Sequence, residues 1–118
     1  MKLFDSELRL MDLIWEREGC TAKEFSLLAL ERFGWNKNTT YTVLKKLVAK
    51  NAVERTEPGF RCSALISRSE VAKEETAGLI EKLYGGSKKA FFAAFLQEEA
   101  LSPAELDELR AMIERHEE

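Results

Sequence analysis

A Thr-x-x-Glu capping box at Thr21 and Glu24 fixes the start of a helix early in the chain. In such a box the threonine oxygen accepts a hydrogen bond from the glutamate amide, and the glutamate carboxylate accepts one from the threonine amide. The apolar residues that follow recur at helical spacing and predict a helix to about Arg32. A similar segment precedes it, for which Asp5 or Ser6 can serve as the cap. Two short helices are therefore expected one after the other.

A third helix and a hairpin follow directly. Asn36 can cap a helix to about Lys50, and a Pro58-Gly59 turn then separates two short segments of alternating polarity between Val53 and Ala64. Three helices followed by a β-hairpin are the parts of a winged helix-turn-helix. We therefore expect a mainly α chain with a winged-helix domain over residues 1–66.

Residues 67–118 predict a second region made of helices only. Ser67 or Ser69 can cap a long helix that stops at a Gly-Gly pair, another begins near Ser87, and Ser102 opens the last one. These helices carry more apolar surface than they can bury among themselves, so we expect a helical dimerisation region. The expected interface residues are Leu79, Leu83, Phe91, Phe95, Leu106, Leu109 and Ile113.

The net charge of −3 hides a strong asymmetry along the chain. Between Trp35 and Arg61 there are six basic and two acidic residues, which gives this stretch a charge of +4. From Ser67 onward seven basic residues stand against twelve acidic ones, which gives −5. Phosphate would attract the first stretch and repel the second, so the two regions are expected to have different functions.

The third helix has one apolar and one polar side. On a helical wheel one side, which is mostly apolar and expected in the core, carries Thr40, Val43, Leu44 and Leu47. The polar side and its flank present Asn38, Thr39, Thr42, Lys45 and Lys46. Short hydroxyl and amide groups can reach base edges in a major groove, and lysines can reach phosphates. Such a face also fits a solvated helix, but the preceding capped helix, the basic stretch and the hairpin favour binding to double-stranded DNA.

Other classes of protein have little support in the sequence. Cys20 and Cys62 fit no metal-ligand spacing and are expected to be reduced, partly buried thiols, and a lone His116 near the acidic end is expected to be solvated. Without a glycine-rich phosphate loop or a carboxylate pair beside a nucleophile, we expect neither an enzyme nor a cofactor. No apolar run is long enough for a membrane span or a secretion signal, so we expect a cytoplasmic protein.

Two blocks of residues resemble a known family. The first runs from Glu7 through Met11 to Leu13-Ile14-Trp15, and the second, more specific block is residues 35–51, WNKNTTYTVLKKLVAKN. The chain resembles the penicillinase-repressor (BlaI/MecI/CopY) family of bacterial winged-helix repressors, with Asn51 where the family has glycine. Phe95-Leu96 and the segment from Leu101 to Leu109 are similar to the family's dimerisation helices.

The resemblance implies a homodimer that binds palindromic operators and represses genes for antibiotic resistance or other stress responses. Carried over by position, Asn38, Thr39, Thr42 and Lys46 occupy the DNA-contact positions of the third helix. The hairpin departs from the family pattern, and Arg61 is the candidate for its phosphate contact.

The resemblance also suggests how repression could end. Its β-lactam branch implies a membrane sensor protease as partner, with cleavage in the fifth helix at a bond that corresponds to Ala94-Phe95 here. The phenylalanine is kept and the family's asparagine is not. The copper branch ends in a cysteine-rich motif, and no cysteine follows Cys62.

Two alternatives stay open. One is a winged-helix regulator of multidrug type, which would bind a small effector in an aromatic-lined cavity between its tail helices. The other is a winged-helix module for protein contacts, in which the lysines of the third helix would meet an acidic partner.

Overall fold

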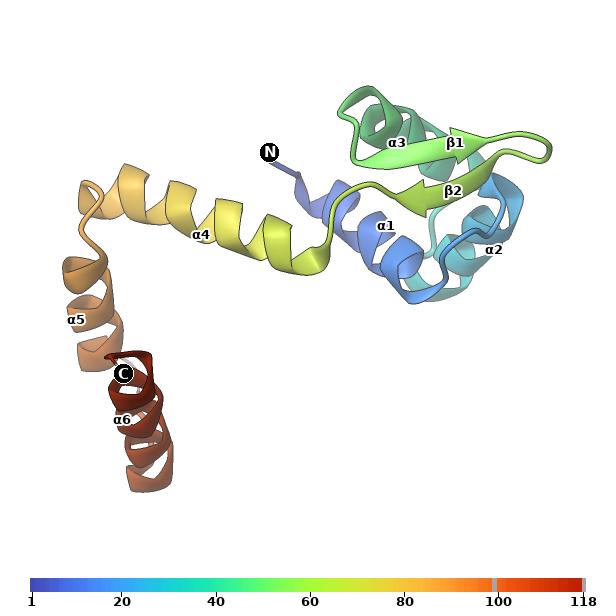
Figure 1. Cartoon of the computed structure of the whole chain (residues 1–118). Coiled ribbons are helices and arrows are strands. Elements are labelled where there is room, and N and C mark those ends of the chain that lie inside the picture. Colours follow the sequence, from blue (N-terminus) through green and yellow to red (C-terminus); the bar gives the residue numbers. More distant parts are fainter. Residues whose placement is uncertain (99, 118) are drawn as a thin grey trace. The chain divides into compact units, whose positions relative to one another are not determined.

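The computed structural model describes residues 1–98 and 100–117 and is mainly helical (Figure 1). The chain divides into two compact units, Met1–Thr76 and Ala77–Glu118. In chain order the elements are α1 (Asp5–Glu16), α2 (Ala22–Phe33), α3 (Lys37–Ala49), β1 (Val53–Thr56), β2 (Arg61–Ala64), α4 (Arg68–Tyr84), α5 (Lys88–Glu98) and α6 (Pro103–Glu117).

The start of α1 differs from the sequence prediction. Its N-cap is Phe4, and Asp5 already lies in the first helical turn, so neither Asp5 nor Ser6 is the cap. The backbone amide of Phe4 donates a hydrogen bond at 2.8 Å to the carboxylate of Glu7, three positions later in the chain. A carboxylate that reaches back in this way needs no polar side chain at the cap itself.

The starts of α2 and α3 follow the prediction. Thr21 Oγ1 accepts a hydrogen bond from the Glu24 amide at 3.1 Å, and Glu24 Oε1 accepts one from the Thr21 amide at 3.0 Å. Asn36 Oδ1 accepts a hydrogen bond from the Thr39 amide at 2.8 Å. Both helices are thus anchored at their first turn, where four backbone amides have no partner within the helix.

One core joins the three helices and the hairpin. Leu10, Phe25 and Leu44 come from α1, α2 and α3 and are fully buried, as are Val53 and Cys62 from the two strands. The inner face of α3 is the predicted one, with Thr40, Val43, Leu44 and Leu47 buried. Burial raises the pKa of the Cys62 thiol to about 11, so this free cysteine is an unreactive part of the core.

The hairpin, residues 53–64 and hereafter the wing, is antiparallel and connected to the helices. Val53 pairs with Ala64 and Thr56 with Arg61, and the predicted Pro58-Gly59 turn lies between the strands. Gly59 has a φ of 87°, a left-handed backbone angle that glycine adopts without steric cost. A further bridge between Thr21 and Arg61 joins the wing to the segment that precedes α2. This arrangement confirms the predicted winged helix.

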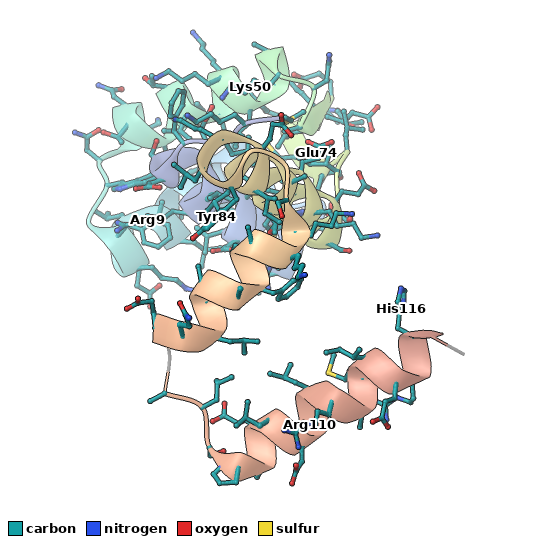
Figure 2. All side chains as sticks on the ribbon, turned by 90° about the vertical axis from the view of Figure 1, so that its left-hand side faces the viewer. Arg9, Lys50, Glu74, Tyr84, Arg110 and His116 are labelled. Carbon is teal, nitrogen blue, oxygen red and sulfur yellow. The ribbon has the colours of Figure 1, made fainter. Side chains whose placement is uncertain are left out.

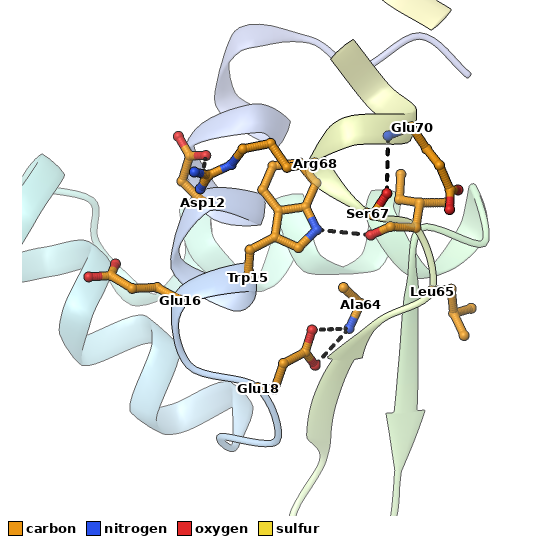
Figure 3. Close-up of a pocket in the computed structure, with 10 residues that line it drawn as sticks. Asp12, Trp15, Glu16, Glu18, Ala64, Leu65, Ser67, Arg68 and Glu70 are labelled. Atoms are coloured by element: carbon orange, nitrogen blue, oxygen red, sulfur yellow. Dashed lines mark hydrogen bonds and ion pairs between the residues drawn. The ribbon is translucent and has the colours of Figure 1, made fainter. Parts of the chain in front are cut away.

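The first turns of α4 pack on α1 (Figure 3). The Trp15 indole donates a hydrogen bond to the Ile66 carbonyl at 2.9 Å, and Arg68 contacts both the Asp12 carboxylate at 3.0 Å and the Trp15 ring. Val71 belongs to the core. The N-terminal unit therefore reaches to Thr76, ten residues beyond the boundary expected from the sequence.

The C-terminal unit buries few of its apolar side chains. The Tyr84 and Phe91 rings meet edge to face at 5.5 Å, which links the end of α4 to α5. Of its described residues, only Ile80 is buried, with 8% of its surface exposed, whereas the apolar residues along α5 and α6 are partly or largely exposed. His116 lies near the end of α6 and is exposed (Figure 2). None of the described helices combines the length and the hydropathy that a membrane span requires.

Candidate nucleic-acid interface

The outer face of α3 brings together the residues that the sequence predicted to contact DNA. The side of α3 opposite to these residues lies in the core. Five of the predicted residues are exposed along the helix: Asn38, Thr39, Thr42, Lys45 and Lys46. A helix held by its inner face and presenting short polar groups and cations outward has the shape and chemistry to enter a major groove.

The hydrogen bonds at the start of α3 separate the roles of two of these residues. The Thr39 hydroxyl donates a hydrogen bond to Asn36 Oδ1 at 3.0 Å, so in this state Thr39 offers only acceptor capacity to a ligand. Among the described residues, no hydrogen bond engages the side chain of Thr42. Thr42 is therefore the better placed of the two to exchange donor and acceptor bonds with a base edge.

The cations of α3 differ in how free they are. Lys37 lies over the Tyr41 ring at 5.7 Å. Within the part of the chain that the structure describes, no carboxylate lies within ion-pair distance of Lys37, Lys45 or Lys46. These three ammonium groups are available to phosphate.

Lys50, at the end of α3, is engaged inside the protein. Its ammonium contacts Glu7 Oε1 at 2.7 Å and the Lys2 carbonyl at 3.0 Å, and it lies over the Phe4 ring. The Glu7 side chain is 1% exposed and that of Lys50 is 30% exposed. Burial alone would raise the pKa of Glu7, but the hydrogen bonds from Lys50 and Phe4 and the charges of Lys50 and Lys46 outweigh it and lower this pKa. The pair ties the end of α3 to the start of α1.

Arg61 lies where the wing meets the segment before α2. Its guanidinium donates a hydrogen bond to the Gly19 carbonyl at 2.9 Å. The side chain is exposed and has further donors, so the predicted phosphate contact of Arg61 stays a prediction.

The tip of the wing contains an arrangement that the sequence pattern did not reveal. Arg55 stacks on the Phe60 ring, with its guanidinium carbon 3.9 Å from the ring centroid, and forms an ion pair with Glu57 at 2.7 Å. The Phe60 ring meets the Tyr41 ring of α3 edge to face at 6.4 Å. A signal was present, because Arg55 near the end of β1 and Glu57 in the turn that follows are two positions apart and have opposite charges.

The hydrogen bond from Arg55, followed by those from the Phe60 and Gly59 amides, lowers the pKa of Glu57. Its carboxylate is therefore ionised at neutral pH.

A pocket of about 880 Å³ lies away from α3, beside the junction of α1 with the segment that follows β2 (Figure 3). Its wall includes the Trp15 ring and several carboxylates, and most of these groups already have partners. Arg68 covers Trp15 and binds Asp12, the Glu18 carboxylate accepts the Ala64 amide, and Arg32 binds Glu16. Most of the pocket wall is thus paired within the protein, and the pocket belongs to the N-terminal unit, whereas the effector-binding alternative expects an aromatic cavity between the tail helices.

Comparison with known proteins places this geometry in a family. The family model described as penicillinase repressor matches residues 3–115. A penicillinase repressor from Bacillus licheniformis is 25% identical over 117 residues, covering 98% of this chain and 91% of its own length. The methicillin resistance regulatory protein MecI from Mammaliicoccus sciuri is 22% identical, with coverage of 97% and 94%.

Among solved structures, the monomeric form of Bacillus licheniformis BlaI in complex with the blaP half-operator superposes with a TM-score of 0.53 at 25% identity. The match covers 59% of this chain and 88% of that one. The predicted family and fold class are confirmed. This chain belongs to the penicillinase repressor family, a family of DNA-binding transcriptional repressors and not of enzymes.

Proposed function

We propose that this protein is a cytoplasmic repressor that binds a palindromic operator as a homodimer and inserts one α3 into the major groove of each half-site. The observation that carries the proposal is the outer face of α3, where exposed hydroxyl, amide and ammonium groups lie opposite a face that is buried in the core. The regulated genes would be those for antibiotic resistance or another stress response.

Each residue of the interface has a role in this proposal. Asn38 and Thr42 contact base edges and determine sequence preference, and Thr39 accepts a hydrogen bond while it holds the cap. Lys45 and Lys46 contact phosphates, which position the helix without reading sequence. Arg61 adds a phosphate contact where the wing meets the segment before α2.

The homodimer is proposed from the apolar side chains of the C-terminal unit. In the single chain Phe91 is half-buried. The other expected interface residues keep between 37% and 67% of their surface exposed: Leu79, Leu83, Phe95, Leu106, Leu109 and Ile113. Burying such side chains contributes about 25 cal/mol per Å² of apolar area. A second copy would supply this cover, and its two-fold axis would match a palindromic site.

A membrane sensor protease is proposed as the partner that ends repression, with Ala94-Phe95 as the cleaved bond. Phe95 is 46% exposed, and the bond lies within α5, so a protease would have to unwind that helix locally. Cleavage there would remove α6 from the chain. In cells challenged with the inducing compound, the proposal requires fragments that end at Ala94 and begin at Phe95.

The test begins with the full chain and a pool of random-sequence duplexes, from which bound DNA is recovered and sequenced. A palindrome is expected, because two copies of α3 related by a two-fold axis read the same half-site. Sedimentation of the chain with and without the recovered duplex gives the number of protomers. A chain that stays monomeric at micromolar concentration, or a recovered site without symmetry, contradicts the homodimer.

A matched pair of variants isolates the interface. Leu83→Glu places a charge on a leucine that is 67% exposed in the C-terminal unit, and Leu27→Glu does the same on one that is 58% exposed on α2. Leu83→Glu is expected to shift the chain toward monomer and to weaken binding to the palindrome more than to a half-site. Leu27→Glu should leave the protomer number unchanged.

A further inference from the structure

The wing carries a guanidinium, that of Arg55, which is linked to α3 through two aromatic rings and is paired with a carboxylate within the protein. The contacts Lys37 to Tyr41, Tyr41 to Phe60 and Phe60 to Arg55 form a continuous series of cation–π and edge-to-face contacts from α3 to the wing. Arg55 is therefore connected to α3 through the Phe60 and Tyr41 rings. Its guanidinium, however, already has a carboxylate partner.

Arg55 and Glu57 form a close ion pair in which two guanidinium nitrogens contact one carboxylate oxygen. Arg55 Nε and Nη2 both lie 2.7 Å from Glu57 Oε1, while Glu57 Oε2 accepts a hydrogen bond from the Phe60 amide at 3.2 Å. The carboxylate is thus fixed by the turn, and the guanidinium is fixed against the Phe60 ring. Neither group has to be ordered at the moment of pairing, which removes part of the entropic cost of an exposed ion pair.

We propose that Glu57 withholds Arg55 from DNA phosphate, so that the wing limits the affinity of this protein for DNA. The inference rests on DNA binding through α3, as proposed above. Transfer of Arg55 to a phosphate would break the pair and would also leave the freed Glu57 carboxylate facing the DNA backbone. Like charges at close range oppose this exchange, so the wild-type complex keeps the Arg55–Glu57 pair.

The central experiment measures the salt dependence of binding for Glu57→Gln. The glutamine keeps a side-chain oxygen for the Phe60 amide and loses the charge that holds Arg55. The probe is a half-site duplex from the recovered palindrome, beside a shuffled duplex of equal length. One additional phosphate contact is expected to steepen the slope of log affinity against log salt by about 0.9. From about 0.20 to about 0.05 M salt this amounts to about a 3.5-fold larger gain in affinity than for the wild type.

Three further variants make the result specific to Arg55. Arg55→Ala is expected to leave the wild-type slope unchanged, because the wild-type complex does not use this guanidinium. In the double variant Arg55→Ala/Glu57→Gln the steeper slope should be lost. Glu54→Gln removes the same charge from a neighbouring exposed residue of the wing and is expected to leave the slope within about 0.2 of the wild type.

The proposal is overturned if Glu57→Gln leaves the slope unchanged, if its gain persists without Arg55, or if Arg55→Ala alone flattens the wild-type slope. Thermal unfolding of each variant shows whether the N-terminal unit is still folded, since Trp15 and Trp35 both lie in it. A wild-type chain that binds neither duplex would instead contradict DNA binding through α3, so the two failures are distinguishable.

Discussion

Replacing Lys50 by methionine should destabilise the N-terminal unit through a residue that touches no DNA in our proposal. The methionine keeps the apolar stem but leaves the Glu7 carboxylate, which is 1% exposed, without its cation. Glu7 Oε2 already has no hydrogen-bond partner among the described residues, so the remaining charge would be poorly compensated. Breaking a fully buried ion pair from one side costs about 3–5 kcal/mol. Because the Lys50 side chain is 30% exposed, we expect about 2–3 kcal/mol at pH 7.

The pH dependence of the free energy of unfolding tests the same prediction independently. In the wild type the pKa of Glu7 is lowered by folding, so the pair stabilises the fold above the unfolded value of 4.5, and this contribution is lost as pH falls through the folded pKa. In Lys50→Met the hydrogen bond and the charge of Lys50 are lost, so burial dominates and the pKa of Glu7 should rise. The variant then gains stability relative to the wild type as pH falls, and the difference between the two should shrink toward pH 4.

Urea unfolding followed by tryptophan fluorescence, at one protein concentration and at several pH values, measures both effects. Lys45→Met is the matched control, because Lys45 lies on the same helix, is exposed and has no described carboxylate within ion-pair distance. Its effect should stay within about 0.5 kcal/mol. A loss below about 0.5 kcal/mol for Lys50→Met, or a loss that is the same at pH 7 and pH 4, would refute the reasoning.

Three further substitutions test the candidate interface. Thr42→Ala should weaken binding to the recovered operator by about 1–3 kcal/mol and change binding to shuffled DNA little, as titrations of both duplexes would show; equal losses would exclude a base contact. Lys46→Ala should flatten the slope of log affinity against log salt by about 0.9 on a half-site, and an unchanged slope would remove this residue from the phosphate contacts. Asn36→Ala removes the cap of α3 and should lower the free energy of unfolding by about 0.5–2 kcal/mol in urea titrations, whereas no loss would show that the cap is dispensable.

The local signals in the sequence determined most of the N-terminal fold. The capping box of Thr21 and Glu24 and the cap of Asn36 each involve residues three positions apart, so the pattern itself brings the partners together once a helical turn forms. The period of the apolar residues in α3 determined in the same way which face enters the core. The cap of α1 could not be predicted in this way, because Phe4 has no polar side chain and its amide is satisfied by Glu7.

The tertiary structure alone decided which basic residues are available to DNA. The stretch from Trp35 to Arg61 carries a charge of +4, but Lys50 is paired with Glu7, a residue 43 positions away. One donor of Arg61 is used by the Gly19 carbonyl, 42 positions away, while its other side-chain donors have no partner among the described residues and stay free for phosphate. No local pattern links such partners, since their distance depends on how α1, α3 and the wing pack around a common core. The same packing draws the first turns of α4 into the N-terminal unit, because Val71 fills the core and Arg68 reaches Asp12. The short-range hydrogen bonds could therefore be predicted from the sequence. Which basic residues of the candidate interface have no partner within the protein could be seen only in the folded structure.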